Sequence, residues 1–119
     1  MMRAVLVAKT KYILLIPLNY NDGTKVPDAD LDEIYDELYA LTSAYSLAGT
    51  VIGAYRMKDG SKQIDRSTMI WIGIEDGQED RLKRIVAEIC RRLGQEAIYL
   101  ERTGGTIEFI PPLNAGDQT

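Results

Sequence analysis

The stretch Tyr12-Ile13-Leu14-Leu15-Ile16-Pro17-Leu18 decides the fold class, because it is apolar on both of its alternating faces. A continuous apolar run of this length is typical of a strand covered on both sides of a sheet, although a buried helical turn would give the same pattern. Pro17 lacks the N–H that a ladder hydrogen bond requires, so we expect it at a strand end, a bulge or an edge. The turn formers Asn19–Gly23 end the run. Upstream, Ala4–Ala8 either extends this strand or forms a separate short one.

Two amphipathic helices are predicted downstream, over Asp30–Leu47 and Gln78–Leu93. In the first helix, Asp30 and Glu33 have the spacing of a capping box. In the second, acidic residues come first, basic residues come last, and Gly94 follows as the expected stop. Each helix carries one apolar stripe at three- and four-residue steps, which indicates that one side packs against a core. The stripe of the second helix consists of Leu82, Ile85, Val86, Ile89 and Leu93.

Further strands are predicted where β-branched and aromatic residues cluster. Thr50–Met57 and Ser67–Ile74 flank a polar connection that is short enough to make the two strands antiparallel neighbours. On the later strand, the isoleucines point to one face and the alternating residues to the other, and both faces are apolar. After the second helix we expect a strand at Ala97–Glu101, a turn at Gly104-Gly105 and a short extra C-terminal strand at Thr106–Ile110.

The predicted order is strand, helix, strand, strand, helix, strand. This is the split βαβ arrangement, so the sequence predicts an α+β, ferredoxin-like βαββαβ domain over residues 1–112, with a flexible tail over 113–119. In that architecture, an antiparallel sheet carries both helices on one face. Because the strands are apolar on both faces, something must cover the other one, and a second copy of the chain is the simplest cover. We therefore expect a homodimer through the open sheet face.

Composition excludes several classes of function. The 119 residues are 45% hydrophobic and 27% charged, which is ordinary for one globular domain. A formal charge of -4 argues against binding to a nucleic-acid backbone. An RNA-recognition module would also need alternating aromatics on its third strand, where only Trp71 stands. No run approaches a membrane span and no signal peptide is evident, so no membrane partner and a cytoplasmic location are expected. The single Cys90 fits a reducing compartment.

The chain contains no histidine and one cysteine. This removes Ser-His-Asp and Cys-His catalysis and the usual zinc, haem and iron–sulfur ligand sets. Asp28-x-Asp30-x-Asp32 begins like a calcium loop, but the glycine and the bidentate glutamate that such a loop needs are missing, so helix capping explains these residues. Glycine-rich nucleotide fingerprints are absent. We expect no metal and no cofactor, and no residue is nominated as catalytic.

Two features favour a ligand site. The first is the tyrosine-rich aromatic set, in which Tyr55 and Trp71 lie on predicted strands and suit either a pocket or core and interface packing. The second is a set of polar residues at strand ends, which either orient an anionic small molecule or merely solvate the surface. The candidate ligand-binding residues are Tyr55, Arg56, Arg66, Ser67, Trp71 and Gln95.

The span from Asp32 to Glu101 resembles a family of small bacterial domains of unknown function. The similarity lies in a Gly-x-x-x-Gly-x-Tyr second strand over Gly49–Tyr55, in Arg66-Ser67 opening the third strand, and in the segment Leu93–Ile98. The resemblance implies a ferredoxin-like fold and no particular activity.

Three functional hypotheses follow. The leading one is a non-enzymatic homodimer that binds a small molecule or another protein. The second is a cofactor-independent enzyme acting on an apolar or anionic small molecule between sheet and helices, with substrate reactivity supplying much of the chemistry. The third is an acidic inhibitor or immunity-type protein that masks a basic partner.

Overall fold

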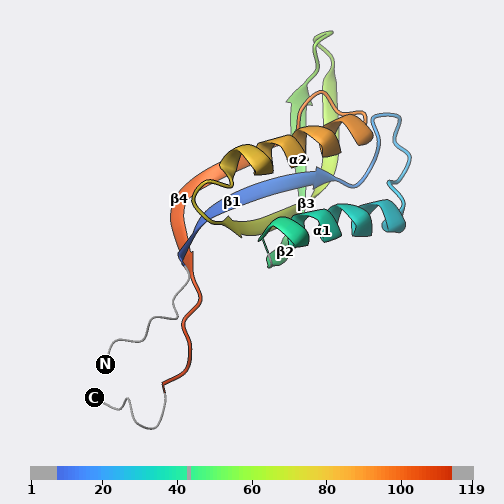
Figure 1. Cartoon of the computed structure of the whole chain (residues 1–119). Coiled ribbons are helices and arrows are strands. Elements are labelled where there is room, and N and C mark those ends of the chain that lie inside the picture. The colour runs from blue at the N-terminus through green and yellow to red at the C-terminus, as the bar shows by residue number, and fades with distance from the viewer. Residues whose placement is uncertain (1–7, 43, 114–119) are drawn as a thin grey trace.

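The four strands form one antiparallel sheet in the order β2-β3-β1-β4 (Figure 1). The computed structural model describes residues 8–42 and 44–113. Strand β1 (Ala8–Pro17) lies in the centre, paired with β3 (Lys62–Ile74) on one side and β4 (Leu100–Glu108) on the other. Strand β2 (Tyr45–Arg56) forms the edge beyond β3. This topology confirms the predicted α+β, ferredoxin-like class. Residues 4–7 and 114–119 of the expected leading strand and tail lie outside the described residues.

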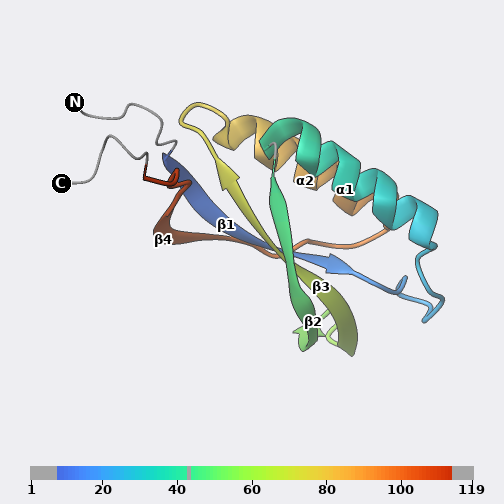
Figure 2. The same cartoon turned by 90° about the horizontal axis from the view of Figure 1, so that it is seen from below.

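Both helices, α1 (Asp28–Thr42) and α2 (Glu79–Arg92), cover the same face of the sheet (Figure 2). Alternate residues of the central strands point into this layer, because side chains alternate between the faces of a strand. Leu14, Ile70 and Leu82 are fully buried there. The core therefore lies between the sheet and the helix pair, and no helix from residues 8–42 or 44–113 covers the other sheet face. That uncovered face bears Ile13, Met69 and Trp71.

The first helix ends at Thr42, and its predicted extension to Leu47 is wrong. The Thr42 hydroxyl donates to the Leu38 carbonyl at 2.8 Å and accepts from the Ala44 amide at 3.3 Å. Tyr45 then pairs with Ile72 in the sheet. Its ring still stacks on Tyr35 of α1, with 5.8 Å between ring centroids. Tyr45 therefore contacts the helix although its own backbone is extended. This explains why its position in the sequence fitted the apolar spacing of a longer helix.

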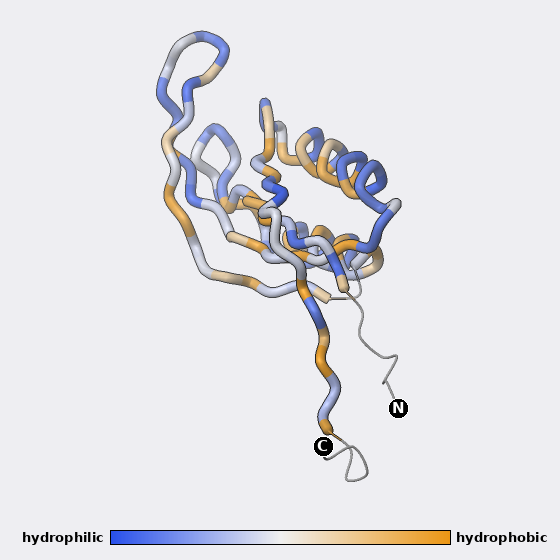
Figure 3. Tube along the Cα trace, turned by 90° about the vertical axis from the view of Figure 1, so that its left-hand side faces the viewer, coloured by the Kyte–Doolittle hydropathy of each residue, from blue (hydrophilic) through white to orange (hydrophobic). Residues whose placement is uncertain are grey.

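The β2–β3 connection is a tight hairpin, shorter than predicted. Ladder pairing continues out to Arg56 and Lys62, and the Met57 amide donates to the Ser61 carbonyl at 2.9 Å to close the turn. The outer part of this hairpin, residues 50–66, is called the arm below. Its hydrophilic turn projects away from the two helices (Figures 1 and 3). A register shift between Leu47 and Thr50 separates the arm from the base of β2.

The expected Ala97–Glu101 strand, Gly104-Gly105 turn and Thr106–Ile110 strand are one strand, β4 (Leu100–Glu108). The glycine pair forms a bulge, since the pairing with β1 shifts register between Thr10 and Tyr12. Gly104 has a positive φ of 77°, which an L side chain rarely adopts. The sequence predicted that the Gly-Gly pair would reverse the chain, but the pair forms a bulge within one strand. No separate fifth strand forms among the described residues.

Candidate functional site

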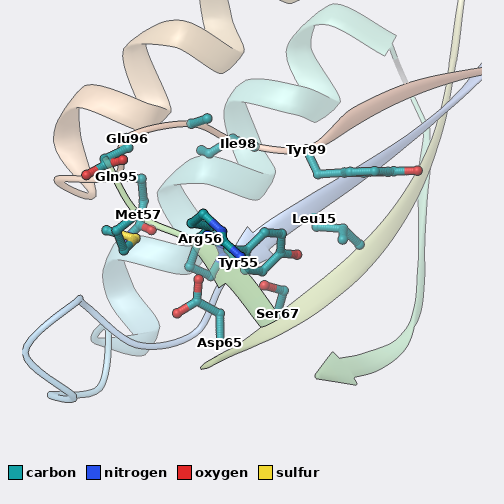
Figure 4. Close-up of a pocket in the computed structure, with 12 residues that line it drawn as sticks. Leu15, Tyr55, Arg56, Met57, Asp65, Ser67, Gln95, Glu96, Ile98 and Tyr99 are labelled. Atoms are coloured by element: carbon teal, nitrogen blue, oxygen red, sulfur yellow. The ribbon is translucent and has the colours of Figure 1, made fainter. Parts of the chain in front are cut away.

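A cavity of about 150 Å³ lies between the arm and the connection from α2 to β4 (Figure 4). We call it the arm pocket. One wall is formed by residues of the arm, including Tyr55, Arg56 and Asp65. The opposite wall is the segment Gln95–Tyr99, and the base is contributed by β1 and β3. Four separate segments of the chain therefore meet at this pocket.

Strand register places the base and the arm wall on the same side of the sheet. Pro17 of β1 pairs with Ser67 of β3, and Ser67 pairs in turn with Val51 of β2. Asp65 lies two residues before Ser67, so their side chains share a face. This is the uncovered face. Because side chains alternate along β3, Asp65 and Ser67 both face the pocket and make this part of its lining polar.

Gly53 lets Tyr55 lie flat along the arm. A Cβ atom at position 53 would stand only 2.7 Å from the Tyr55 hydroxyl oxygen and 2.9 Å from ring carbons, closer than atoms pack. Gly53 and Tyr55 belong to the Gly-x-x-x-Gly-x-Tyr pattern, and here the second glycine makes room for the tyrosine ring. The pattern thus has a physical role at the pocket wall.

Polar groups of the pocket are held by hydrogen bonds to neighbouring residues and across the pocket. The Asp65 carboxylate accepts from the Gln63 amide nitrogen at 3.0 Å, and Gln95 donates to the Leu93 carbonyl at 3.2 Å. Glu96 accepts from the Lys58 backbone amide at 3.2 Å, which ties the arm's turn to the opposite wall. Ser67 is only 4% exposed and is one of the few buried polar residues in the described part of the chain. Carboxylates and hydroxyls thus surround a small apolar base.

Tyr99 is held in its protonated form. Its hydroxyl donates to the Glu101 carboxylate at 2.6 Å, and this hydrogen bond, with burial and nearby negative charge, raises the pKa of Tyr99. A phenol with a raised pKa donates hydrogen bonds but does not accept a proton near neutrality. Tyr99 is therefore suited to binding a ligand by its ring and not to general-base catalysis.

Four of the six predicted ligand-binding residues meet at this pocket: Tyr55, Arg56, Ser67 and Gln95. Arg66 does not, because it alternates with the two pocket residues of β3, Asp65 and Ser67. Trp71 lies farther along β3 on the uncovered face, with the Lys11 ammonium 4.1 Å from its ring centroid.

Sequence reasoning missed Asp65 and Glu96 as pocket residues. Tyr99 belongs to the tyrosine-rich set on predicted strands, but it was not among the six candidate ligand-binding residues. Asp65 had a usable signal, since it stands two residues before Ser67 on one strand. Glu96 had none, because it approaches the arm only through the tertiary fold. No helix within the described ranges combines the length and apolarity that a membrane crossing needs.

Comparisons with known proteins show similarity at the level of the fold. No family model matches the chain, and no curated protein matches it. A phage SAM lyase solved in complex with S-methyl-5′-thioadenosine has a TM-score of 0.60 and 16% identity, covering 87% of this chain and 90% of that chain. A phage SAM lyase in its apo state has a TM-score of 0.56 and 15% identity, covering 96% of this chain and 98% of that one. At these identities the likeness shows the fold alone.

Proposed function

We propose that the arm pocket binds a small molecule of the adenosine-thioether class, S-adenosylmethionine (SAM) or S-methyl-5′-thioadenosine. The observation that carries the proposal is the lining, in which two tyrosines stand beside two carboxylates, those of Asp65 and Glu96. The fold likeness to the phage SAM lyase supports it, since that protein holds S-methyl-5′-thioadenosine on a chain of similar length.

The charge pattern suits a sulfonium ion. Aromatic ring faces attract cations by about 0.5–2 kcal/mol, and a carboxylate nearby adds a Coulomb attraction that strengthens away from bulk water. Tyr55 and Tyr99 supply the ring faces and Asp65 supplies the charge. Arg56 lies at the same pocket and is suited to the carboxylate of the amino-acid end, because a guanidinium binds carboxylates in a bidentate manner.

The enzyme hypothesis gains from the same comparison, and SAM cleavage is its specific form. Removing the amino-acid arm from SAM breaks the bond between its Cγ carbon and the sulfonium sulfur, and the electron pair of that bond leaves on sulfur as the neutral thioether S-methyl-5′-thioadenosine. In the same step the substrate's own carboxylate oxygen attacks Cγ, so the amino-acid arm departs as a homoserine lactone. The departing group needs no proton, so this step does not require a histidine. The pocket would contribute binding and orientation, and the substrate's own reactivity would carry the bond cleavage.

Binding titrations with paired ligands test the proposal. Asp65→Asn should weaken SAM binding about tenfold, because one charge pair is lost, and should change binding of the uncharged S-methyl-5′-thioadenosine far less. Asp76→Asn, at an exposed loop position outside the arm pocket, is the matched control. Calorimetry measures the affinities, and chromatography of SAM incubations measures release of S-methyl-5′-thioadenosine. Failure of both ligands to bind at millimolar concentration would overturn the proposal.

We further propose that two copies of the chain pair over the centre of the uncovered sheet face. Support comes from half-buried apolar residues there, Ile13, Leu15 and Met69. The size of the arm pocket also favours it, since about 150 Å³ is less than the roughly 300–1,000 Å³ of ligand pockets that enclose a whole molecule. Sedimentation at micromolar concentration should give twice the mass of the chain, and a mass equal to one chain would contradict the pairing.

A cytoplasmic location and the acidic-inhibitor hypothesis stay predictions. Cys90 is a free thiol whose pKa is raised by burial, which agrees with a structural role in a reducing compartment. The inhibitor hypothesis rests on net charge alone, and co-purification with a basic protein would support it over ligand binding.

A further inference from the structure

A second hollow, of about 220 Å³, lies on the uncovered face at the opposite end of the sheet from the arm pocket. We call it the Trp71 hollow. Its lining is mostly apolar and aromatic, and it includes Trp71, Gly73, Ile107, Phe109, Lys11 and Ser46. None of these residues lines the arm pocket. Trp71, a residue that the sequence nominated for ligand binding, therefore has a site of its own.

Gly73 allows the side wall of this hollow to form. A Cβ atom at position 73 would stand 3.0 Å from Cβ of Lys9 and 3.1 Å from Cδ1 of Ile107, so any larger residue would push both side chains away. With glycine there, Lys9 reaches across β3 and donates to the Thr42 carbonyl at 2.6 Å. Lys9 is thus engaged in the structure of the wall.

Lys11 brings a positive charge to the hollow. Its ammonium lies 4.1 Å from the Trp71 ring centroid, and it forms no ion pair with a carboxylate within residues 8–42 and 44–113. Lysine carries three donors, so an ammonium resting on a ring keeps donors for an anion. On a chain with a net charge of -4, a half-buried lysine against the Trp71 ring is a local site for negative charge.

We propose that the Trp71 hollow binds a small organic carboxylate with an aromatic body. The ring of such a ligand would lie against Trp71 and Phe109, and its carboxylate would accept a hydrogen bond from Lys11. Ser46, exposed at the rim, offers a second donor. A few polar groups around an apolar hollow are the usual composition of a small-molecule site.

The fluorescence of Trp71, the single tryptophan of the chain, reports on the hollow directly. Phenylacetate is the probe and phenylacetamide is the uncharged control of the same shape. Excitation at the red edge of indole absorption avoids the seven tyrosines. Phenylacetate should change the emission saturably, and phenylacetamide should bind about tenfold more weakly because it lacks the charge.

Two lysine variants complete the test. Lys11→Gln should weaken phenylacetate binding about tenfold and make the protein indifferent to the charge of the probe. Lys25→Gln, in the exposed loop before α1, should leave the affinity unchanged. Equal affinities for the two probes, a Lys11→Gln affinity like that of the parent, or a signal that follows a change of sedimenting mass would each overturn the inference. Because SAM and the arm-pocket variants play no part, failure here leaves the proposed function standing.

Discussion

Glu79 shows how single side chains set the acid stability of this protein. Burial first, and then the neighbouring Glu79 carboxylate, raise the pKa of Tyr12, whose hydroxyl is buried. In return, the Tyr12 hydroxyl first, and then Lys83 and Arg102, lower the pKa of Glu79 below its ordinary value of 4.5. Lys83 and Arg102 lie 3.5 Å and 3.7 Å from its carboxylate oxygens.

A lowered carboxyl pKa gives a definite pH dependence. The folded state gains stability from ionised Glu79 above its unfolded-state pKa, and loses it as the pH falls through the lower folded-state value. The difference in melting temperature between the parent and Glu79→Gln should therefore be largest near neutrality and shrink in acid. Thermal melts over a pH series measure it, with Glu75→Gln, an exposed carboxyl nearby, as control. A difference that grows on acidification would contradict the assignment.

Residue identity predicted part of the arm pocket. Tyr55 and Ser67 stood out because one is an amphipathic aromatic and the other opens an apolar strand, and both line the pocket. Arg66 does not line this pocket, since strand alternation turns it from the face that Ser67 occupies, and its role in ligand binding stays a prediction. Glu96 could not be found from local pattern, because its partner Lys58 lies in the arm's turn, 38 residues away in sequence.

At the scale of elements, the two helices are joined by Arg92. Its guanidinium near the end of α2 binds Glu33 at 3.5 Å and also Glu37, both on α1. Helical periodicity in the sequence shows that this side of α2 is polar, but it does not show which neighbouring element the side meets. The observed contacts make Arg92 a link between elements.

Arg92→Ala should lower the free energy of unfolding by about 1 kcal/mol, because two carboxylates lose one partly buried partner. Arg91→Ala is the matched control. Among the residues that the structure describes, Arg91 pairs only with Glu88 on its own helix and is largely exposed, so its loss should cost less than about 0.5 kcal/mol. Urea unfolding of both variants measures the difference, and equal costs would show that the link between helices contributes nothing.

Element boundaries were predicted well where turn chemistry is strong and poorly where contacts cross the chain. Gly94 follows α2 with a positive φ of 63°, in agreement with the expected stop. The end of α1 was missed because Tyr45 packs on Tyr35 from a strand. The bulge at Gly104 was missed because pairing with β1, a non-local interaction, keeps β4 continuous.

At the scale of the whole molecule, the proposed dimer depends on the apolar residues of the uncovered sheet face. Met69→Glu places a charge at the centre of that face and should shift the proposed dimer to monomers. Ile52→Glu places the same charge on the arm at a residue that is 72% exposed, on the other face of the hairpin, and should leave the mass unchanged. Sedimentation velocity distinguishes the two. If Ile52→Glu dissociated the dimer and Met69→Glu did not, the interface would have to lie on the arm and not at the centre of the sheet face.

The pairing of β1 with β4 has a consequence for biosynthesis. Ala8 pairs with Glu108, so one edge of the central strand acquires its neighbour only after nearly all the other elements have been translated. Until then a nascent chain presents an apolar strand with an unoccupied edge, which is a template for aggregation. Slower elongation near the β4 codons would prolong that exposure, and the yield of native protein from a translation system should depend on it.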